Sequence, residues 1–327
     1  MLFRSDRYGD LSDAGNLTPS LGLLILAAVV REKGYRVALL DAAAENLSFE
    51  EALERVETIR PNVVGFSATT LSILGAERFA ETLKQRRPQT RTIVGGPHVT
   101  AVPRDTLNRC SHLDIAVLGE AEDTILDLLN ALAAGGDVPK VSGVAYRDSD
   151  GNIVQTQRRD GVTDMNALPH PAWDLLPGFP ERYNPPYFKV QRLPSTSIVT
   201  SRGCPYQCTF CDTSVFGSKV RGYSAEYLVD MLRRLATDYG IRDITFEDDT
   251  FMFLPQRLRA VCEALIQSDL NLSWACNSRV DLAKPDLLKL MRRAGCWYIS
   301  FGIDQAAKLI NYLFSVINIY CHLGYPF

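Results

Sequence analysis

The first part of the chain alternates two kinds of hydrophobic pattern. Apolar residues recur every three or four positions, as expected of amphipathic helices, in 20–34, 49–59, 75–86 and 123–135. Short apolar runs, which are typical of buried strands, lie between them at 35–41, 62–69, 91–98 and 114–122. Strands that alternate with helices predict a parallel sheet, because parallel neighbours need a crossover connection. We therefore expect an α/β domain over residues 1–135.

The polar loops of this domain follow its predicted strands. In a doubly wound parallel sheet, of the Rossmann-like or flavodoxin-like kind, ligands bind at the carboxyl ends of the strands. The segments that fall there are "SATTLS", "GGPH" and "GEAE". Any ligand of this domain should therefore contact these three loops.

The pattern changes after residue 135. Residues 141–156 predict a hairpin, with Asp150 and Gly151 at its turn. Residues 168–187 are rich in proline and lack helical or strand periodicity. We interpret 136–195 as a hairpin and a Pro-rich linker between two domains.

From residue 196 the alternation resumes. Strand patterns lie at 196–203, 243–251, 272–279 and 297–304, and helical patterns lie between them at 224–240, 255–268 and 284–295. Four successive β/α units predict a partial β/α barrel over residues 196–327. Barrels carry their chemistry on the loops after the strands, and these loops contain "GCPYQCTFC", "EDD" and "NSR".

Composition and charge narrow the function classes. The chain of 327 residues has a net charge of −3, so we expect no nucleic-acid partner. The most apolar run, 21–30, is too short for the roughly 20 residues of a membrane-spanning helix, so we expect no stable membrane span. The N-terminus lacks the apolar core of a secretory signal peptide. We therefore expect a cytoplasmic protein, whose thiols stay reduced.

Three cysteines lie close together, as Cys204, Cys208 and Cys211. A reducing compartment and an odd number of thiols argue against disulfides. Structural zinc takes four ligands, usually in two close pairs, and the sequence has no second pair. An iron–sulfur cluster is the remaining candidate. Three protein thiolates would leave one iron of a four-iron cluster open to a substrate.

The other cysteines are scattered. Cys262, Cys276 and Cys296 each fall in a predicted helix or strand, and we expect them to pack in the core as small apolar residues. We assign no role to Cys110 or Cys321.

The segment "CPYQCTFC" resembles the signature of the radical S-adenosylmethionine (SAM) superfamily. The resemblance implies a [4Fe–4S] cluster that binds SAM and cleaves it reductively, and an electron donor such as flavodoxin or ferredoxin. "FEDDTF" and "NSRVD" resemble the segments of that family near SAM, so the implied SAM-binding residues are Phe210, Glu247, Asp248, Asp249, Asn277 and Arg279. Acidic residues of surface loops are commonly solvated instead, so both interpretations of 247–249 stay open.

The N-terminal segments "VVGFSATT", "IVGGPHVT" and "VLGEAE", with "PAWDLLP" in the linker, resemble the cobalamin-binding radical SAM proteins. Glycines let the backbone approach a large flat ligand. The implied cobalamin-binding residues are Ser67, Thr69, Thr70, Gly95, Gly96, Gly119 and Glu120.

The chain lacks the Asp-x-His-x-x-Gly motif that supplies histidine to cobalt in cobalamin-dependent mutases. We expect cobalt without a protein histidine ligand, and His98 hydrogen-bonded to the backbone. As ligands of cobalt, Glu120 and Glu122 are disfavoured in the same way, because acidic residues here suit the N-terminal end of a helix better. A partner domain without any cofactor also stays open.

Together these motifs predict a radical SAM enzyme that acts with cobalamin on a small molecule, by methyl transfer, cyclisation or oxidation. They assign no catalytic residue. A non-enzymatic iron–sulfur or cobalamin-binding protein, or an inactive fragment of such an enzyme, is the alternative.

Both ends of the chain predict that it is incomplete. "MLFRS" has too little apolar pattern for a first strand, and the family pattern fades at Asp304, Gln305 and Ala306. Four β/α units stand against six in the family core, which predicts an open edge and a labile cluster. Alternatively, "LINYLFSVINIY" forms a helix that covers this edge.

Overall fold

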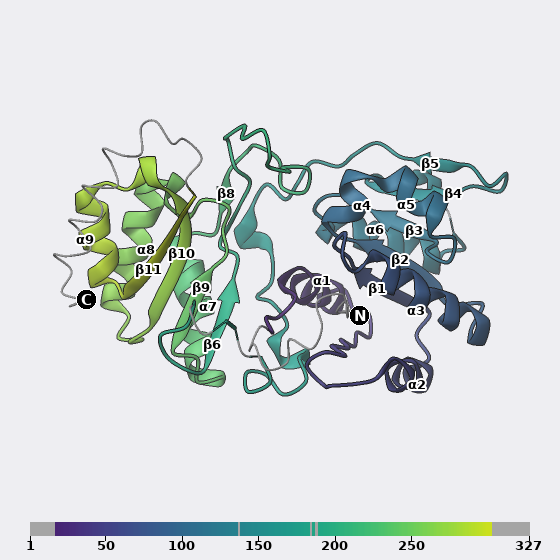
Figure 1. The fold of residues 1–327 in the computed structure, drawn as a ribbon, viewed down its shortest axis with the longest axis horizontal. Helices are drawn as coiled ribbons and strands as arrows, with labels where there is room; N and C mark the ends of the chain where they lie inside the picture. The colour runs from purple at the N-terminus through teal and green to yellow at the C-terminus, as the bar shows by residue number, and fades with distance from the viewer. Residues whose placement is uncertain (1–16, 137, 184, 187–188, 303–327) are drawn as a thin grey trace.

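The computed structural model describes residues 17–302, apart from residues 137, 184, 187 and 188. The described chain forms two α/β halves, each built round its own sheet (Figure 1). The predicted α/β class is confirmed. The expectations for the two chain ends and for Cys321 lie outside the described residues.

The N-terminal sheet has five strands in the order β1-β2-β3-β4-β5. The first three pair in parallel, and the last two are antiparallel; the strands are β1 (Val63–Ser67), β2 (Arg91–Gly95), β3 (Ile115–Val117), β4 (Val144–Arg147) and β5 (Ile153–Gln155). The hairpin that we expected in 136–195 is formed by β4 and β5. It extends the N-terminal sheet beyond residue 135, because β4 pairs with the edge of β3 that would otherwise stay open.

Helices cover both faces of this sheet. One face packs against α2 (Phe49–Ile59), α3 (Ile73–Arg86), α4 (Pro97–Ala101) and α5 (Pro103–Arg109), and the other packs against α6 (Glu122–Ala133). Helices α4 and α5 were not predicted, because they are too short for a periodic pattern. Each begins at a proline, which suits the first turn of a helix.

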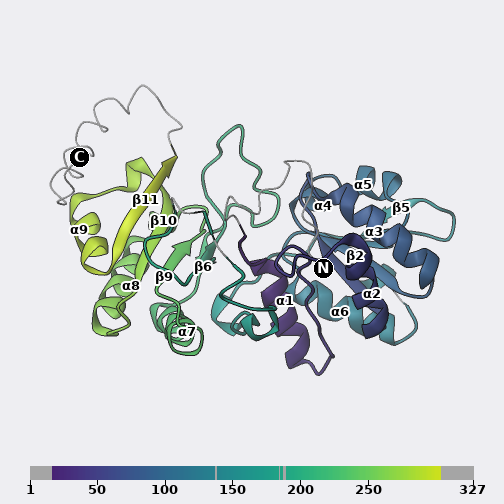
Figure 2. The ribbon, with the colours of Figure 1, turned by 60° about the horizontal axis from the view of Figure 1, so that its bottom comes forward.

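Helix α1 (Leu21–Glu32) does not join the N-terminal core. Its residues Leu24, Ile25 and Val29 are buried with Trp173 of the linker and with the core of the C-terminal half. Figures 1 and 2 both show α1 between the two halves. The helix therefore bridges the halves rather than covering the first sheet.

The segment 35–41, which we predicted as a strand, is not one. Only Asp41 forms an isolated bridge. Val37 and Leu39 pack beside the alanines of α1, whereas Leu40 lies in the core beneath the N-terminal sheet. The segment is therefore apolar because it packs against two cores, and not because it pairs with a strand.

The C-terminal sheet is parallel, in the order β11-β10-β9-β6. Its strands are β6 (Ser195–Ile198), β9 (Asp243–Phe246), β10 (Ser273–Arg279) and β11 (Cys296–Gly302). The crossovers are α7 (Ala225–Asp238), α8 (Pro255–Gln267) and α9 (Pro285–Arg293), which lie along one side of the curved sheet (Figure 2). Ser224 caps α7 by accepting a hydrogen bond from the Tyr227 amide at 3.2 Å.

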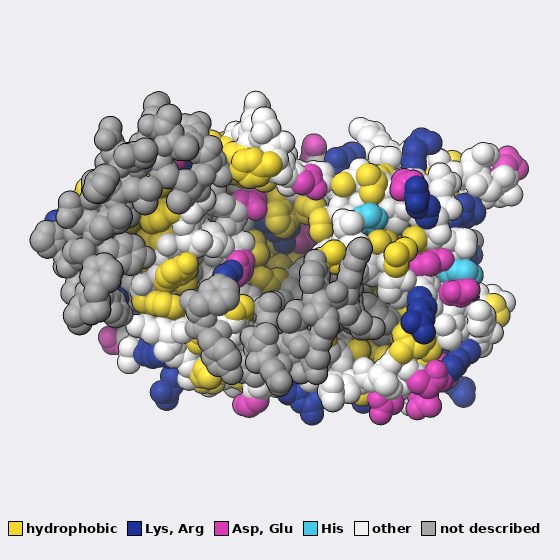
Figure 3. Space-filling model, in the orientation of Figure 1, with side chains coloured by type: hydrophobic (Ala, Val, Ile, Leu, Met, Phe, Trp, Pro, Cys, Tyr) yellow, Lys and Arg dark blue, Asp and Glu magenta, His cyan; other side chains and the backbone are white. Residues whose placement is uncertain are grey.

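Short elements complete the fold. The strands β7 (Ser201–Arg202) and β8 (Arg221–Gly222) form an antiparallel ribbon. The 3-10 helices are η3 (Val138–Lys140), η4 (Met165–Ala167), η5 (Trp173–Leu175), η7 (Phe251–Phe253) and η8 (Val280–Leu282). No described helix is long and apolar enough to span a membrane. The surface is hollowed between the halves, and hydrophobic side chains are visible inside the hollow (Figure 3).

Candidate functional site

The three clustered cysteines lie on one loop, residues 203–220, between β7 and β8; we call it the cysteine loop. The Cys204 amide donates to the Gly217 carbonyl at 3.1 Å, which joins the two legs of the loop, and the Cys211 amide donates to the Cys208 carbonyl at 3.0 Å. None of the three cysteines forms a disulfide. Cys204 and Cys208 are half-buried, and Cys211 is exposed.

The thiols influence one another electrostatically. The pKa of Cys211 is raised by its partial removal from water, and further by the nearby Cys204, Asp249 and Cys208. Within the described part of the chain, no three potential ligand side chains converge at metal-binding distances. The thiols are therefore close enough to repel as thiolates, without a preformed metal geometry.

Two predicted SAM-binding residues, Glu247 after β9 and Asn277 in β10, contact each other. The Asn277 side-chain amide donates to Glu247 Oε2 at 3.0 Å. Lys189, from the linker, donates to Glu247 Oε1 at 3.3 Å. Glu247 is thus held by both neighbours and keeps partial access to solvent, because about a third of its side chain is exposed.

Asp248 occupies a different environment from Glu247. It is 1% exposed, and it accepts hydrogen bonds from the Thr200 amide at 2.5 Å, the Thr200 hydroxyl at 2.7 Å and the Ser201 hydroxyl at 2.5 Å. This carboxylate anchors the segment between β6 and β7, and its oxygens are already hydrogen-bonded to protein donors. Asp249 is exposed beside it and accepts a backbone hydrogen bond from Gly203.

Arg279 reaches from the end of β10 to the cysteine loop. Its guanidinium lies 3.9 Å from the centre of the Tyr206 ring and 3.8 Å from Cys208 Sγ. Asp281 accepts two hydrogen bonds from the same guanidinium, at 3.1 and 3.0 Å. Phe210 stays 75% exposed. The structure therefore brings Arg279 to the thiol of Cys208 and leaves the Phe210 ring exposed on the surface.

The predicted cobalamin residues lie mostly at the carboxyl ends of β1 and β2. Ser67 and Gly95 end these strands and are partner residues in the parallel pairing. Thr69 and Thr70 are exposed in the following loop. His98 Nδ1 lies 3.1 Å from the Thr70 hydroxyl. The imidazole ring therefore bonds a side chain, whereas we expected it to bond the backbone.

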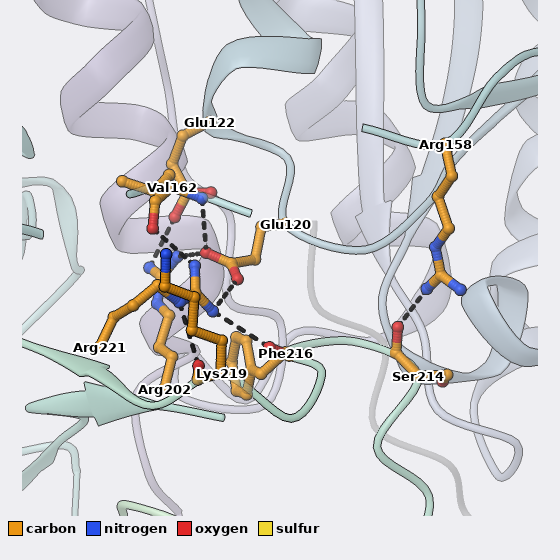
Figure 4. Close-up of polar contacts among 9 residues, drawn as sticks. All are labelled: Glu120, Glu122, Arg158, Val162, Arg202, Ser214, Phe216, Lys219 and Arg221. Carbon is orange, nitrogen blue, oxygen red and sulfur yellow. Dashed lines mark hydrogen bonds and ion pairs between the residues drawn. The ribbon is translucent and has the colours of Figure 1, made fainter. Parts of the chain in front are cut away.

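Glu120 has a different partner from the one that we expected. Its carboxylate accepts hydrogen bonds from Arg202 at 2.7 Å and Arg221 at 2.5 Å, and Glu122 accepts one from Arg202 at 2.6 Å (Figure 4). The four side chains are between 2% and 8% exposed. We call them the interdomain clamp. The side chain of Glu120 is therefore occupied by protein cations, and Glu122 is more than a charge at a helix end.

Sequence reasoning missed Lys189, Arg202 and Arg221. Arg202 stands two positions before Cys204, which is a weak signal. The partners of Lys189 and Arg221 lie far away in the sequence, so no local pattern identifies them. Cys262, Cys276 and Cys296 are buried, as predicted, and so is Cys110.

Comparison with known families gives two matches. Residues 9–129 match the model described as "B12 binding domain", and residues 198–316 match the "Radical SAM superfamily". These ranges contain the ends of the parallel strands β1, β2 and β3 and the cysteine loop.

Two curated relatives match over most of the chain. An uncharacterized methyltransferase of Pyrococcus horikoshii is 34% identical over 90% of this chain and 63% of its own length. An anaerobic magnesium-protoporphyrin IX monomethyl ester cyclase of Rubrivivax gelatinosus is 31% identical over 94% of this chain and 56% of its own length. The chain thus spans about three-fifths of these relatives.

A solved structure has the same fold. The cobalamin-dependent S-adenosylmethionine radical enzyme OxsB, with aqua-cobalamin and S-adenosylmethionine bound, superposes with a TM-score of 0.78 at 20% identity, over 93% of this chain and 44% of OxsB. The fold, the two family models and the cysteine loop agree. The chain belongs to the radical SAM superfamily, among its members that carry a cobalamin (B12)-binding domain.

Proposed function

We propose that this protein is a radical SAM enzyme that cleaves S-adenosylmethionine reductively with a [4Fe–4S] cluster, and that it uses cobalamin to act on a small molecule. The observation that carries the proposal is the cysteine loop. It holds three cysteines outside any disulfide, at the end of a parallel sheet where β/α proteins place their chemistry. The Pyrococcus relative favours methyl transfer, and the Rubrivivax relative favours cyclisation.

The donor set fits an iron–sulfur cluster. Thiolates are the usual ligands of such clusters. The pKa of Cys211 is raised first by burial and then by the nearby Cys204, Asp249 and Cys208, and a bound cation would relieve the repulsion among these groups. The remaining described cysteines are buried, so Cys204, Cys208 and Cys211 are the ligands that we propose. When bound, the cluster supplies an electron and an open iron for SAM.

The surroundings of the loop fit SAM, which carries an amino group and a carboxylate. Glu247 supplies a part-exposed carboxylate for the amino group, and Arg279 supplies a cation for the carboxylate. Asn277 orients Glu247 through its hydrogen bond. We assign Asp248 to positioning, because its oxygens are satisfied by Thr200 and Ser201.

The strand ends of the N-terminal half fit a large flat ligand. Gly95 and Gly96 leave the end of β2 without bulk, and Thr69 and Thr70 expose hydroxyls in the adjacent loop. We propose that cobalamin binds over these loops and over Gly119, with no histidine from the chain on cobalt. A flavodoxin or ferredoxin is the class of electron donor that this chemistry needs.

The test is SAM cleavage by anaerobically reconstituted protein in the presence of dithionite. We expect 5′-deoxyadenosine from the wild type, and loss of both four-iron absorbance and product when Cys204, Cys208 or Cys211 is replaced by Ala. Cys110→Ala is the matched control, because this buried thiol lies in the N-terminal half. Iron content that survives the triple substitution would sink the assignment, and SAM binding without cleavage would favour a non-enzymatic protein.

A further inference from the structure

The interdomain clamp holds the base of the cysteine loop. Arg202 lies on β7 and Arg221 on β8, and the two are directly paired across the ribbon. The chain enters the cysteine loop after Arg202 and leaves it before Arg221. Glu120 binds both arginines, so one carboxylate of the N-terminal half grips both legs of the loop.

The charges make this grip necessary for the loop's present position. Two arginines directly opposite each other on paired strands repel, and a buried charge without a partner is strongly unfavourable. Glu120 and Glu122 balance the two cations within a nearly dry cluster. Without Glu120, Arg221 would lose its ion pair, and the ribbon would have to move toward solvent.

The same arginines hold the return leg of the loop. Arg221 donates to the Phe216 carbonyl at 3.1 Å and the Lys219 carbonyl at 3.3 Å. Arg202 lies 5.5 Å from the centre of the Phe216 ring. Arg158 donates to the Ser214 carbonyl (Figure 4). The clamp therefore orders the backbone that closes behind Cys211.

Gly161 leaves room for the clamp. A Cβ built on this glycine would clash with Glu120 Oε1 and would lie 2.6 Å from Arg221 Nη1. The next residue, Val162, contacts both partners: its carbonyl accepts from Arg221 at 2.6 Å, and its amide donates to Glu120 at 3.3 Å. The absence of a side chain at residue 161 is thus a second, independent requirement of the ion pair between Glu120 and Arg221.

We propose that Glu120 is a positioning residue that sets the cysteine loop relative to the strand ends of the N-terminal half. The inference rests on the proposed function, because it concerns the distance between the cluster and cobalamin sites. Glu120 directly follows Gly119, just after β3 ends at Val117, so one short segment joins the two sites. Misplacement of reacting groups by about 1 Å can lower a rate by roughly 10²-fold.

Two substitutions test this role by different routes. Glu120→Gln removes the charge with little change of shape, and Gly161→Ala inserts a methyl group while keeping every charge. Glu77→Gln is the matched control for the first, since Glu77 bonds His112 within the N-terminal half. Gly22→Ala is the control for the second, because a Cβ at Gly22 meets nothing within 4 Å.

Hydrogen–deuterium exchange of the full chain without cofactors is the first measurement. We expect Glu120→Gln and Gly161→Ala, which we call the clamp variants, to exchange amide hydrogens roughly tenfold faster over 203–222. Strands β9 and β10 should keep their protection, and the two controls should match the wild type. This arm needs neither cluster nor cobalamin, so it stands even if the proposed function fails.

Dipolar coupling between the reduced cluster and cob(II)alamin, measured by electron paramagnetic resonance, is the second measurement. At equal iron and cobalamin content, we expect both clamp variants to weaken or broaden this coupling. A merely structural role would lower the cofactor content and leave the coupling of loaded molecules unchanged. Unchanged exchange in both variants, or unchanged coupling in loaded protein, would overturn the proposal. If Glu120→Gln does not fold, Gly161→Ala and Glu122→Gln decide.

Discussion

At the scale of single residues, neighbouring side chains with the same chemistry do different work. Glu247 and Asp248 are adjacent carboxylates, yet one is part-exposed beside Asn277 and the other is buried against Thr200. The alternation of a strand exit sends one side chain toward the loops and the next into the protein. The role of each carboxylate therefore depends on its environment, and the residue type alone does not determine it.

Gly96 and Gly95 offer a matched residue-scale test. Gly96 has a φ of 106°, and a Cβ there would lie 2.7 Å from the Ala68 carbonyl oxygen, whereas a Cβ at Gly95 meets only Val117 O at 3.9 Å. We expect Gly96→Ala to lower the free energy of unfolding by about 1–3 kcal/mol and to weaken cobalamin binding, while Gly95→Ala keeps the fold. Urea titration and cobalamin absorbance measure the two effects. Equal losses in the two variants would refute the steric argument.

At the scale of elements, the linker is a packed part of the molecule. Its residue His170 meets the Tyr227 ring of α7 edge to face, with ring centres 4.8 Å apart. Trp173 of η5 is buried in the C-terminal core. A segment that lacks periodicity in the sequence is therefore held by individual aromatic contacts.

His170 predicts a pH dependence of this contact. Burial lowers the pKa of His170, and Asp230 opposes the shift. The folded state therefore binds the proton less tightly than the unfolded state, so stability present above pH ~6.5, the usual histidine value, is lost as the pH falls below it. We expect His170→Phe, which keeps a ring against Tyr227, to lose less stability than the wild type between pH 7.5 and 5.5 in urea titrations. An equal acid loss in both proteins would exclude His170 as the responsible group.

At the scale of the whole molecule, α1 belongs to the N-terminal part of the sequence but packs in the C-terminal core. Leu24 of α1 and Leu53 of α2 are both fully buried, in different cores. Arg31 also pairs with Asp174 of the linker at 2.6 Å. The two halves are therefore interlocked by a helix and share more than a linker.

This interlocking predicts opposite effects of two similar substitutions. Leu24→Ala and Leu53→Ala should each cost about 2–5 kcal/mol, the usual range for a buried leucine. We expect Leu24→Ala to speed hydrogen exchange in α7 and to spare α3, and Leu53→Ala to do the reverse. Faster exchange in α3 with Leu24→Ala would show that α1 belongs to the N-terminal core after all.

Local chemistry was enough to predict much of this protein. The spacing of Cys204, Cys208 and Cys211 identified the candidate cluster ligands, and the alternation of apolar patterns predicted the parallel strands of both sheets apart from the false strand at 35–41. Hydrophobic period and thiol spacing are properties of neighbouring residues. The tertiary structure alone decided where α1 packs, that β4 pairs with β3, and that Glu120 binds Arg202 and Arg221. Those outcomes depend on partners that lie from tens of positions to more than a hundred away in the sequence. Burial and charge compensation at such contacts arise only when the chain is folded.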